Sequence, residues 1–296
     1  MTKATSEAHV TGVALYNYGE PLLHPRLAEL VRIVRSFDVP CNLSSNLNFV
    51  RDLDELMLAS ATQFRVSLSG FTQPVYGRTH VGGEIEVVKT NMKAVADAKE
   101  RMGSPTALEV VYHRYLGNLD EELAMRDYAF SLGYEFTPVW ALLVTLEKVL
   151  AFDQTDPSLA VLTEEDYALL ERLIVPLPDA LEIAKRHRAE PCTLLENQVT
   201  LDFRGDVMLC CAVYDADKYR VGSYLQTPLD VIQGRKENHD MCATCTKSGG
   251  HVYMTFSAAE FNEVSVQNLF AHYAAHLRRA PAYTTSQAPL PDVIHR

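Results

Sequence analysis

The chain has 296 residues, of which 47% are hydrophobic, enough for a large α/β domain with a smaller one beside it. Its 27 basic and 38 acidic residues give a net charge of −11, which argues against a general nucleic-acid-binding protein, because such proteins carry a basic surface. No leader-like apolar run and no stretch of about 18 apolar residues occurs, so we expect a cytoplasmic protein without a membrane partner.

From residue 10 to about 140, strand-like and helix-like segments alternate. Predicted strands cover 10–16, 41–45, 64–68, 107–112 and 134–140, with predicted helices between them at 25–35, 52–60, 84–102 and 119–132. In the first helix, Leu27, Val31 and Val34 recur at helical spacing. This order predicts a parallel sheet with right-handed crossovers, either an open doubly wound sheet or part of a β/α barrel. In both folds, ligands bind beyond the carboxyl ends of the strands.

After residue 140, the regular alternation of predicted strands and helices ends. Residues 141–190 form a predicted connector, in which Thr163 and Asp166 resemble a helix-capping box. Apolar residues alternate with polar ones on both sides of Gly205, which predicts a β-hairpin, and a helix is predicted over 252–280. We therefore predict four units: a partial barrel over 1–145, a helical connector over 146–190, a cysteine-rich unit over 191–255, and a C-terminal helix with a polar tail over 256–296.

Four of the six cysteines fall close together in sequence and predict a metal centre: Cys192, Cys210, Cys242 and Cys245. Disulfides are not expected without a secretory signal, and clustered cysteines then indicate metal. The Cys-x-x-Cys pair places two thiolates on one turn, and the hairpin brings the other two toward them. Four thiolates suit either tetrahedral zinc or a 4Fe–4S cluster, and ligand type alone does not separate the two. We interpret Cys41 and Cys211 as packing residues, the latter because neighbours in a strand point to opposite faces.

Two motifs together resemble the radical S-adenosylmethionine (SAM) enzymes that carry a C-terminal auxiliary-cluster domain. The run from Leu15 to Pro25 resembles the Gly-Gly-Glu-Pro motif of that family and its usual sequel, with Tyr18 in place of the first glycine. The spacing Cys-x12-Gly-x4-Cys, followed by Cys-x2-Cys, resembles the SPASM pattern. No cysteine follows Cys245, which resembles the half-length twitch version with a single cluster.

The resemblance implies an α/β fold: a partial parallel β/α barrel, with five of six strands expected here, followed by a small cysteine-rich α+β domain. It implies a radical SAM oxidoreductase or modifying enzyme that binds SAM at the barrel's carboxyl end and an auxiliary 4Fe–4S cluster through the four cysteines. The positions that match the SAM site of the family are Tyr18, Gly19, Glu20, Asn46, Ser67 and Ser69. The structural alternatives are a helix-start role for Glu20, a turn role for Asn46 and an ordinary strand role for Ser67.

The implied partners are a small-molecule or peptide substrate and an electron donor such as a flavodoxin or ferredoxin. No residue is assigned as the catalytic group, because in this family the cofactor abstracts the hydrogen atom. A rival hypothesis of another class is a non-catalytic module that binds zinc or an iron–sulfur cluster and serves a protein partner.

The sequence departs from the family at the Cys-x3-Cys-x2-Cys motif, which holds the SAM-cleaving cluster and is absent here. This chain alone is therefore not expected to generate a radical, and a second 4Fe–4S cluster is expected only if a missing amino-terminal segment exists. We expect such a truncation, because the strand over 10–16 would otherwise leave an unpaired apolar edge. A naturally degenerate relative is the alternative.

Overall fold

A computed structural model of the protein describes residues 1–17 and 19–279. Five strands form a parallel sheet in sequential order: β1 (Val13–Ala14), β2 (Cys41–Ser45), β3 (Gln63–Leu68), β4 (Ala107–Arg114) and β5 (Glu135–Trp140). In a doubly wound sheet the strand order reverses at a switch point, whereas each strand of a β/α barrel pairs with the one before it. The observed order therefore confirms the partial β/α barrel and excludes the doubly wound alternative.

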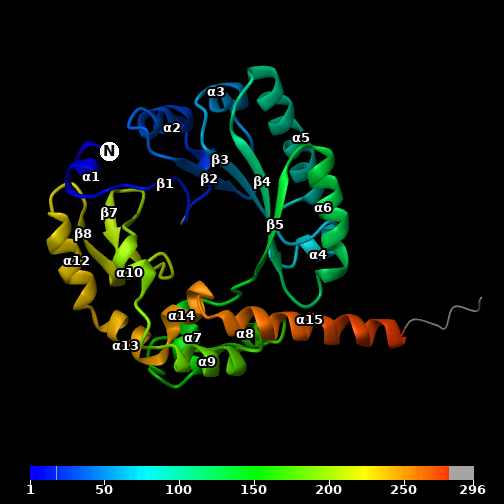
Figure 1. Ribbon diagram of the computed structural model, residues 1–296, viewed down its shortest axis with the longest axis vertical. Coiled ribbons are helices and arrows are strands. Elements are labelled where there is room, and N and C mark those ends of the chain that lie inside the picture. Colours follow the sequence, from blue (N-terminus) through cyan, green and yellow to red (C-terminus); the bar gives the residue numbers. More distant parts are fainter. Residues whose placement is uncertain (18, 280–296) are drawn as a thin grey trace, which may run out of the picture.

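Helices fill the connections between these strands. They are η1 (Pro21–Leu23), α2 (Leu27–Arg35), α3 (Leu53–Leu58), α4 (Gln73–Tyr76), α5 (Ile85–Met102), η2 (Leu119–Glu121) and α6 (Glu122–Ser131), and α1 (Thr2–Glu7) precedes the sheet. Figure 1 shows α2, α3, α5 and α6 along the outer side of the sheet. Every segment predicted up to residue 140 is present, and the largest difference is the first strand, which pairs only through Val13 and Ala14.

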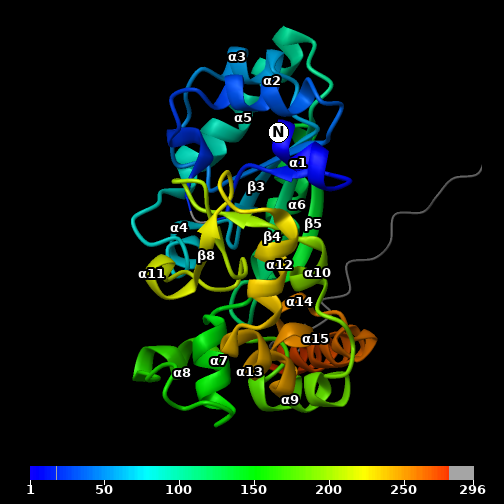
Figure 2. The same ribbon diagram turned by 90° about the vertical axis from the view of Figure 1, so that its left-hand side faces the viewer.

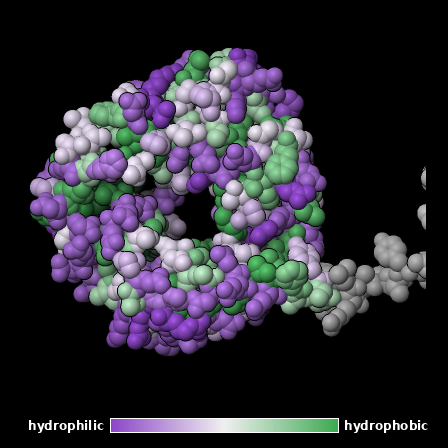
Figure 3. All heavy atoms as spheres, viewed as in Figure 1, coloured by the Kyte–Doolittle hydropathy of each residue, from purple (hydrophilic) through white to green (hydrophobic). Residues whose placement is uncertain are grey.

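The two faces of the sheet differ in polarity. On the helix-covered face, buried residues such as Leu43, Val66 and Val110 form the main core. The opposite face carries partly exposed polar residues at alternate positions: Asn42, Ser44, Gln63, Arg65, Ser67 and His113. Parallel sheets usually have apolar layers on both faces, so a polar face is consistent with a ligand space. The space-filling view shows that the molecule surrounds a central opening (Figure 3).

Beyond residue 140, one part of the chain forms a helical layer, seen at the bottom of Figure 2. It contains α7 (Leu146–Phe152), α8 (Glu164–Leu170), α9 (Leu177–Arg186), α13 (Asp240–Ser248), α14 (Gly250–Thr255) and α15 (Ala259–Arg279). The predicted capping box is confirmed at the start of α8, where Thr163 and Asp166 each accept a hydrogen bond from the other's backbone N–H. Buried side chains from α9 and α14 share one core with Phe261 of α15.

The remaining part is a small antiparallel sheet with short helices. Its strands are β6 (Thr200–Leu201), β7 (Asp206–Met208) and β8 (Arg220–Ser223), and its helices are α10 (Thr193–Asn197), α11 (Ala216–Tyr219) and α12 (Leu229–Glu237). The predicted hairpin is confirmed as β6 and β7, whereas β8 was not predicted. The ammonium of Lys3 in α1 lies 5.1 Å from the ring centre of Tyr224, so the start of the chain contacts this sheet.

No helix among the described residues combines the length and apolar character that a membrane span requires.

Gly249 offers a test of how α13 is positioned. Its backbone φ is 80°, and an added Cβ would lie 2.5 Å from the carbonyl oxygen of Ala184 in α9. Gly133 has a similar φ of 76°, but an added Cβ would have no neighbour within 4 Å. We expect Gly133→Ala to lower the free energy of unfolding by about 1 kcal/mol through backbone strain alone. Gly249→Ala should lower it by roughly 2–5 kcal/mol, because overpacking is added to the strain.

Urea unfolding followed by circular dichroism measures both losses. Equal losses in the two variants would show that the close approach to α9 does not constrain α13.

Candidate functional site

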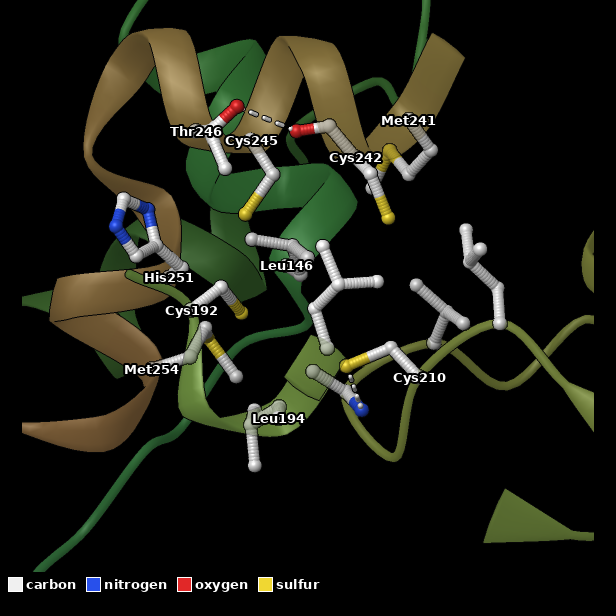
Figure 4. A pocket seen from close by; sticks show the side chains of 14 residues that line it. Leu146, Cys192, Leu194, Cys210, Met241, Cys242, Cys245, Thr246, His251 and Met254 are labelled. Atoms are coloured by element: carbon white, nitrogen blue, oxygen red, sulfur yellow. Dashed lines mark hydrogen bonds between the residues drawn. The ribbon is translucent and has the colours of Figure 1, made fainter. Parts of the chain in front are cut away.

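The four predicted cysteines line one pocket between α10, the end of the hairpin and α13. Figure 4 shows their sulfur atoms turned toward a shared space. The empty space measures about 490 Å³, including the part that opens to solvent. Most of the remaining lining is apolar and includes Leu146, Leu209, Val213, Met241 and Met254.

Local structure explains why these thiols converge. Cys242 and Cys245 lie on α13 rather than on a tight turn, and residues three apart share one face of a helix. The His239 side chain caps this helix by accepting a hydrogen bond from the Met241 N–H at 3.1 Å. Cys192 is the N-cap residue of α10, and Cys210 follows β7.

Burial makes these thiols poor acids in the absence of a bound metal. It raises the pKa of Cys242 to about 11 and also raises the pKa of Cys192 and of Cys245. The cysteines are therefore protonated at neutral pH, and metal binding must release their protons.

Cys211 does not point to the opposite face from Cys210, so that prediction is wrong. Because β7 already ends at Met208, Cys210 has no regular secondary structure and Cys211 lies in a turn, so strand alternation does not apply. A hydrogen bond between their side chains raises the pKa of Cys210 and lowers that of Cys211. Cys41 is fully buried in the sheet, as predicted.

The pocket fits a thiolate-bound group through its donor set and one orphaned polar atom. His251 is 4% exposed; its Nε2 lies 2.9 Å from the Glu190 carbonyl oxygen, and its buried Nδ1 has no hydrogen-bond partner in the described structure. Over residues 1–17 and 19–275, no three His, Cys, Asp or Glu side chains are grouped to hold a single metal ion. Metal ligation by the four cysteines therefore stays a prediction.

A second candidate site lies at the carboxyl end of the sheet, where Glu20 joins the start of η1 to the loop after β2. Its Oε1 accepts a hydrogen bond from the Leu22 N–H at 3.1 Å, and its Oε2 accepts one from the Asn46 N–H at 2.9 Å. Glu20 thus has the helix-start role given as its alternative, and it also fixes the loop after β2. The Asn46 Oδ1 accepts a hydrogen bond from the Asn48 N–H at 3.0 Å, as a turn residue would.

The other predicted SAM-site positions differ in accessibility. An added Cβ at Gly19 would meet no atom within 4 Å, so packing does not require a glycine there. The Ser67 hydroxyl lies on the open face, 3.0 Å from that of Ser44. Ser69 is buried, and its hydroxyl lies 3.0 Å from the His80 Nδ1. Tyr18 lies outside the described residues.

The open face also holds a hydrogen-bonded network that was not predicted. The carboxylate of Glu109 accepts hydrogen bonds from Gln63 at 2.7 Å, Arg65 at 2.8 Å and Thr137 at 2.5 Å. Polar residues at every second position of β3 are a sequence signal for such a face. Nearby, burial lowers the pKa of His113 to about 4, so this imidazole is neutral at neutral pH.

Arg114 lies at the end of β4, beside that face. Its guanidinium donates two hydrogen bonds of 2.5 Å to the carboxylate of Glu122 and lies 5.3 Å from the ring centre of Trp140. These contacts hold a planar cation and an indole side by side at the carboxyl edge of the sheet.

Comparisons with known proteins give structural likenesses only. No family model matches the chain, and no curated protein matches it. Native anSMEcpe with bound AdoMet is 15% identical, with 81% of this chain and 71% of that chain covered and a TM-score of 0.47. SuiB of Streptococcus suis bound to S-adenosylmethionine is 12% identical, with 78% of this chain and 58% of that chain covered and a TM-score of 0.45. A domain of a pyruvate-formate lyase-activating enzyme from Bacteroides vulgatus is 18% identical, with 42% of this chain and 74% of that chain covered and a TM-score of 0.34.

Proposed function

We propose that the protein is a radical SAM-type oxidoreductase or modifying enzyme that holds an auxiliary 4Fe–4S cluster through Cys192, Cys210, Cys242 and Cys245. The observation that carries the proposal is the convergence of four thiols, from three separate segments, on one largely apolar pocket. Thiolates are the ligands that iron–sulfur clusters use. An apolar pocket limits solvent access, which is one of the factors that set the potential of a bound cluster.

The carboxyl edge of the sheet supports the SAM part of the proposal. Glu20 presents a carboxylate between η1 and the end of β2, and such a group binds an ammonium through charge-assisted hydrogen bonds. Ser67 offers a hydroxyl on the adjacent open face. We propose that Glu20 orients the amino group of SAM and that the polar face, with Arg65 and His113, lines the space for a small-molecule or peptide substrate.

When bound, SAM and its cleaving cluster supply the radical, and the auxiliary cluster supplies one-electron chemistry. The residues of this chain bind and orient SAM and the auxiliary cluster. The 296 residues contain no Cys-x3-Cys-x2-Cys run, so we propose that radical generation requires cluster ligands from outside this sequence. The proposed setting is the cytoplasm, with a flavodoxin or ferredoxin as electron donor.

Metal analysis tests the cluster. Anaerobic reconstitution with ferrous iron and sulfide should load about four irons and four sulfides per chain. Cys192→Ser and Cys242→Ser should lower the iron content and the stability of the cluster, because each removes a thiolate ligand. Cys41→Ser, a change at a buried cysteine away from the pocket, is the control. It should bind as much iron and sulfide as the natural chain does.

One zinc per chain with no iron would contradict the proposal. That result would favour the alternative, a zinc-binding interaction module without catalysis.

Calorimetric titration with SAM tests the carboxyl edge. Glu20→Gln removes the negative charge and should weaken SAM binding about tenfold, equivalent to about 1.4 kcal/mol. Glu55→Gln is the control, because Glu55 is exposed and pairs with Arg32 at 2.6 Å on the helix-covered side.

Unfolding curves of both variants separate a lost ligand contact from a lost helix cap. Equal SAM affinity in Glu20→Gln and the natural chain would exclude the proposed role of this carboxylate.

A further inference from the structure

Lys236 is a buried cation beside the cysteine pocket. The residue lies on α12 and is 1% exposed. Its ammonium donates hydrogen bonds to the carbonyl oxygens of Leu195, at 2.9 Å, and Gln198, at 2.8 Å. Among the residues that the structure describes, no Asp or Glu forms an ion pair with it. A buried ammonium without a counter-anion costs several kcal/mol, so this position calls for an anion nearby.

The groups around Lys236 that can become anions are thiols. Leu195, one of the two carbonyl partners of Lys236, lines the same pocket as Cys192, Cys210 and Cys242. A positive charge beside this pocket favours the thiolate form of its cysteines. The two carbonyl partners of Lys236 belong to α10 and the residue that follows that helix, and Cys192 caps the other end of α10. The ammonium therefore joins α12 to the segment that carries one predicted ligand.

We propose that Lys236 is the buried counter-cation of the cysteine pocket, a positioning residue that stabilises the thiolate-bound metal group and raises the reduction potential of the cluster. The inference rests on the proposed function. Four thiolates around a 4Fe–4S core give a net negative group, and reduction adds one more negative charge. A fixed positive charge stabilises the reduced form more than the oxidised form, and net charge is one of the factors that set cluster potentials.

A purely structural role makes a different prediction. If Lys236 only ties α10 to α12, any side chain that donates to the two carbonyls should replace it. Glutamine keeps a donor without the charge, and arginine keeps both the charge and several donors. Comparing Lys236→Gln with Lys236→Arg therefore separates charge from hydrogen bonding.

The experiment measures metal binding and potential on the full chain. Cobalt(II) alone is titrated into the metal-free protein and followed by the absorption of thiolate-bound cobalt. In parallel, the protein reconstituted with iron and sulfide is titrated for its midpoint potential by electron paramagnetic resonance. Lys247→Gln on α13 is the control, because it removes the same charge from an exposed position. Circular dichroism confirms the fold of every variant.

Lys236→Gln should weaken cobalt binding about tenfold or more, as changes next to metal ligands commonly do. It should also lower the midpoint potential, while Lys236→Arg and Lys247→Gln stay close to the natural chain. Unchanged affinity and potential in Lys236→Gln would overturn the inference, and so would equal losses in the glutamine and arginine variants.

Failure of the proposed function gives a separate signature. A natural chain that binds cobalt but loads no iron and sulfide would refute the cluster, and the role of Lys236 would then be decided by the cobalt affinities alone. A chain that binds neither would refute both.

Discussion

The cysteine pocket depends on the packing of α13 against α9. Gly249 ends α13 with a left-handed backbone, and its Cα passes so close to Ala184 that no larger residue fits without a shift. This contact fixes the direction of α13 and therefore the place where Cys242 and Cys245 point. The hairpin and α10 bring the other two thiols to the same pocket. The metal-binding proposal thus rests on helix packing as much as on cysteine spacing.

The polar face of the sheet is the second organising feature. A parallel sheet covered by apolar layers on both sides has no space for a polar ligand on either face. Here Glu109 is nearly buried but satisfied by three donors, so the face keeps its charge without an unpaired group. Glu20 and Ser67 lie toward the carboxyl ends of the strands. The helices pack on one side of the sheet, and the predicted ligand chemistry gathers on the other side and at its carboxyl edge.

Much of the first 140 residues could be predicted because each element carries its own period. Leu27, Val31 and Val34 mark a helix, and buried residues alternate with partly exposed ones along β3. The order of the strands could not be read this way, since periodicity describes one element and strand order describes pairs. The SAM-site residues show a similar limit. The sequence placed Ser67 and Ser69 together, but Ser69 lies past the end of β3 and is buried against His80.

The small cysteine-rich part was harder to predict, for reasons specific to its residues. β8 has four residues and α12 contains a glycine, Gly234, so neither gives a strong pattern. The direction of the Cys211 side chain was predicted wrongly because β7 ends three residues earlier than the alternation of apolar residues suggested. Lys236 did leave a signal, since it follows Ile232 by four residues on the buried side of α12. A lysine on an apolar stripe is easily taken for one whose charged end reaches solvent, and only its carbonyl partners show that it does not.

The charges of the pocket then suggest how binding and folding are linked. Without a metal, burial keeps the thiols protonated and lowers the pKa of Lys236, so the region contains a cation that burial disfavours. A thiolate-bound group reverses this balance, because it places negative charge beside the ammonium. The same lysine changes from a destabilising to a stabilising element when the pocket is filled. Under the proposed role, the metal group therefore acts as part of the fold of α10, α12 and α13, as structural metals do elsewhere.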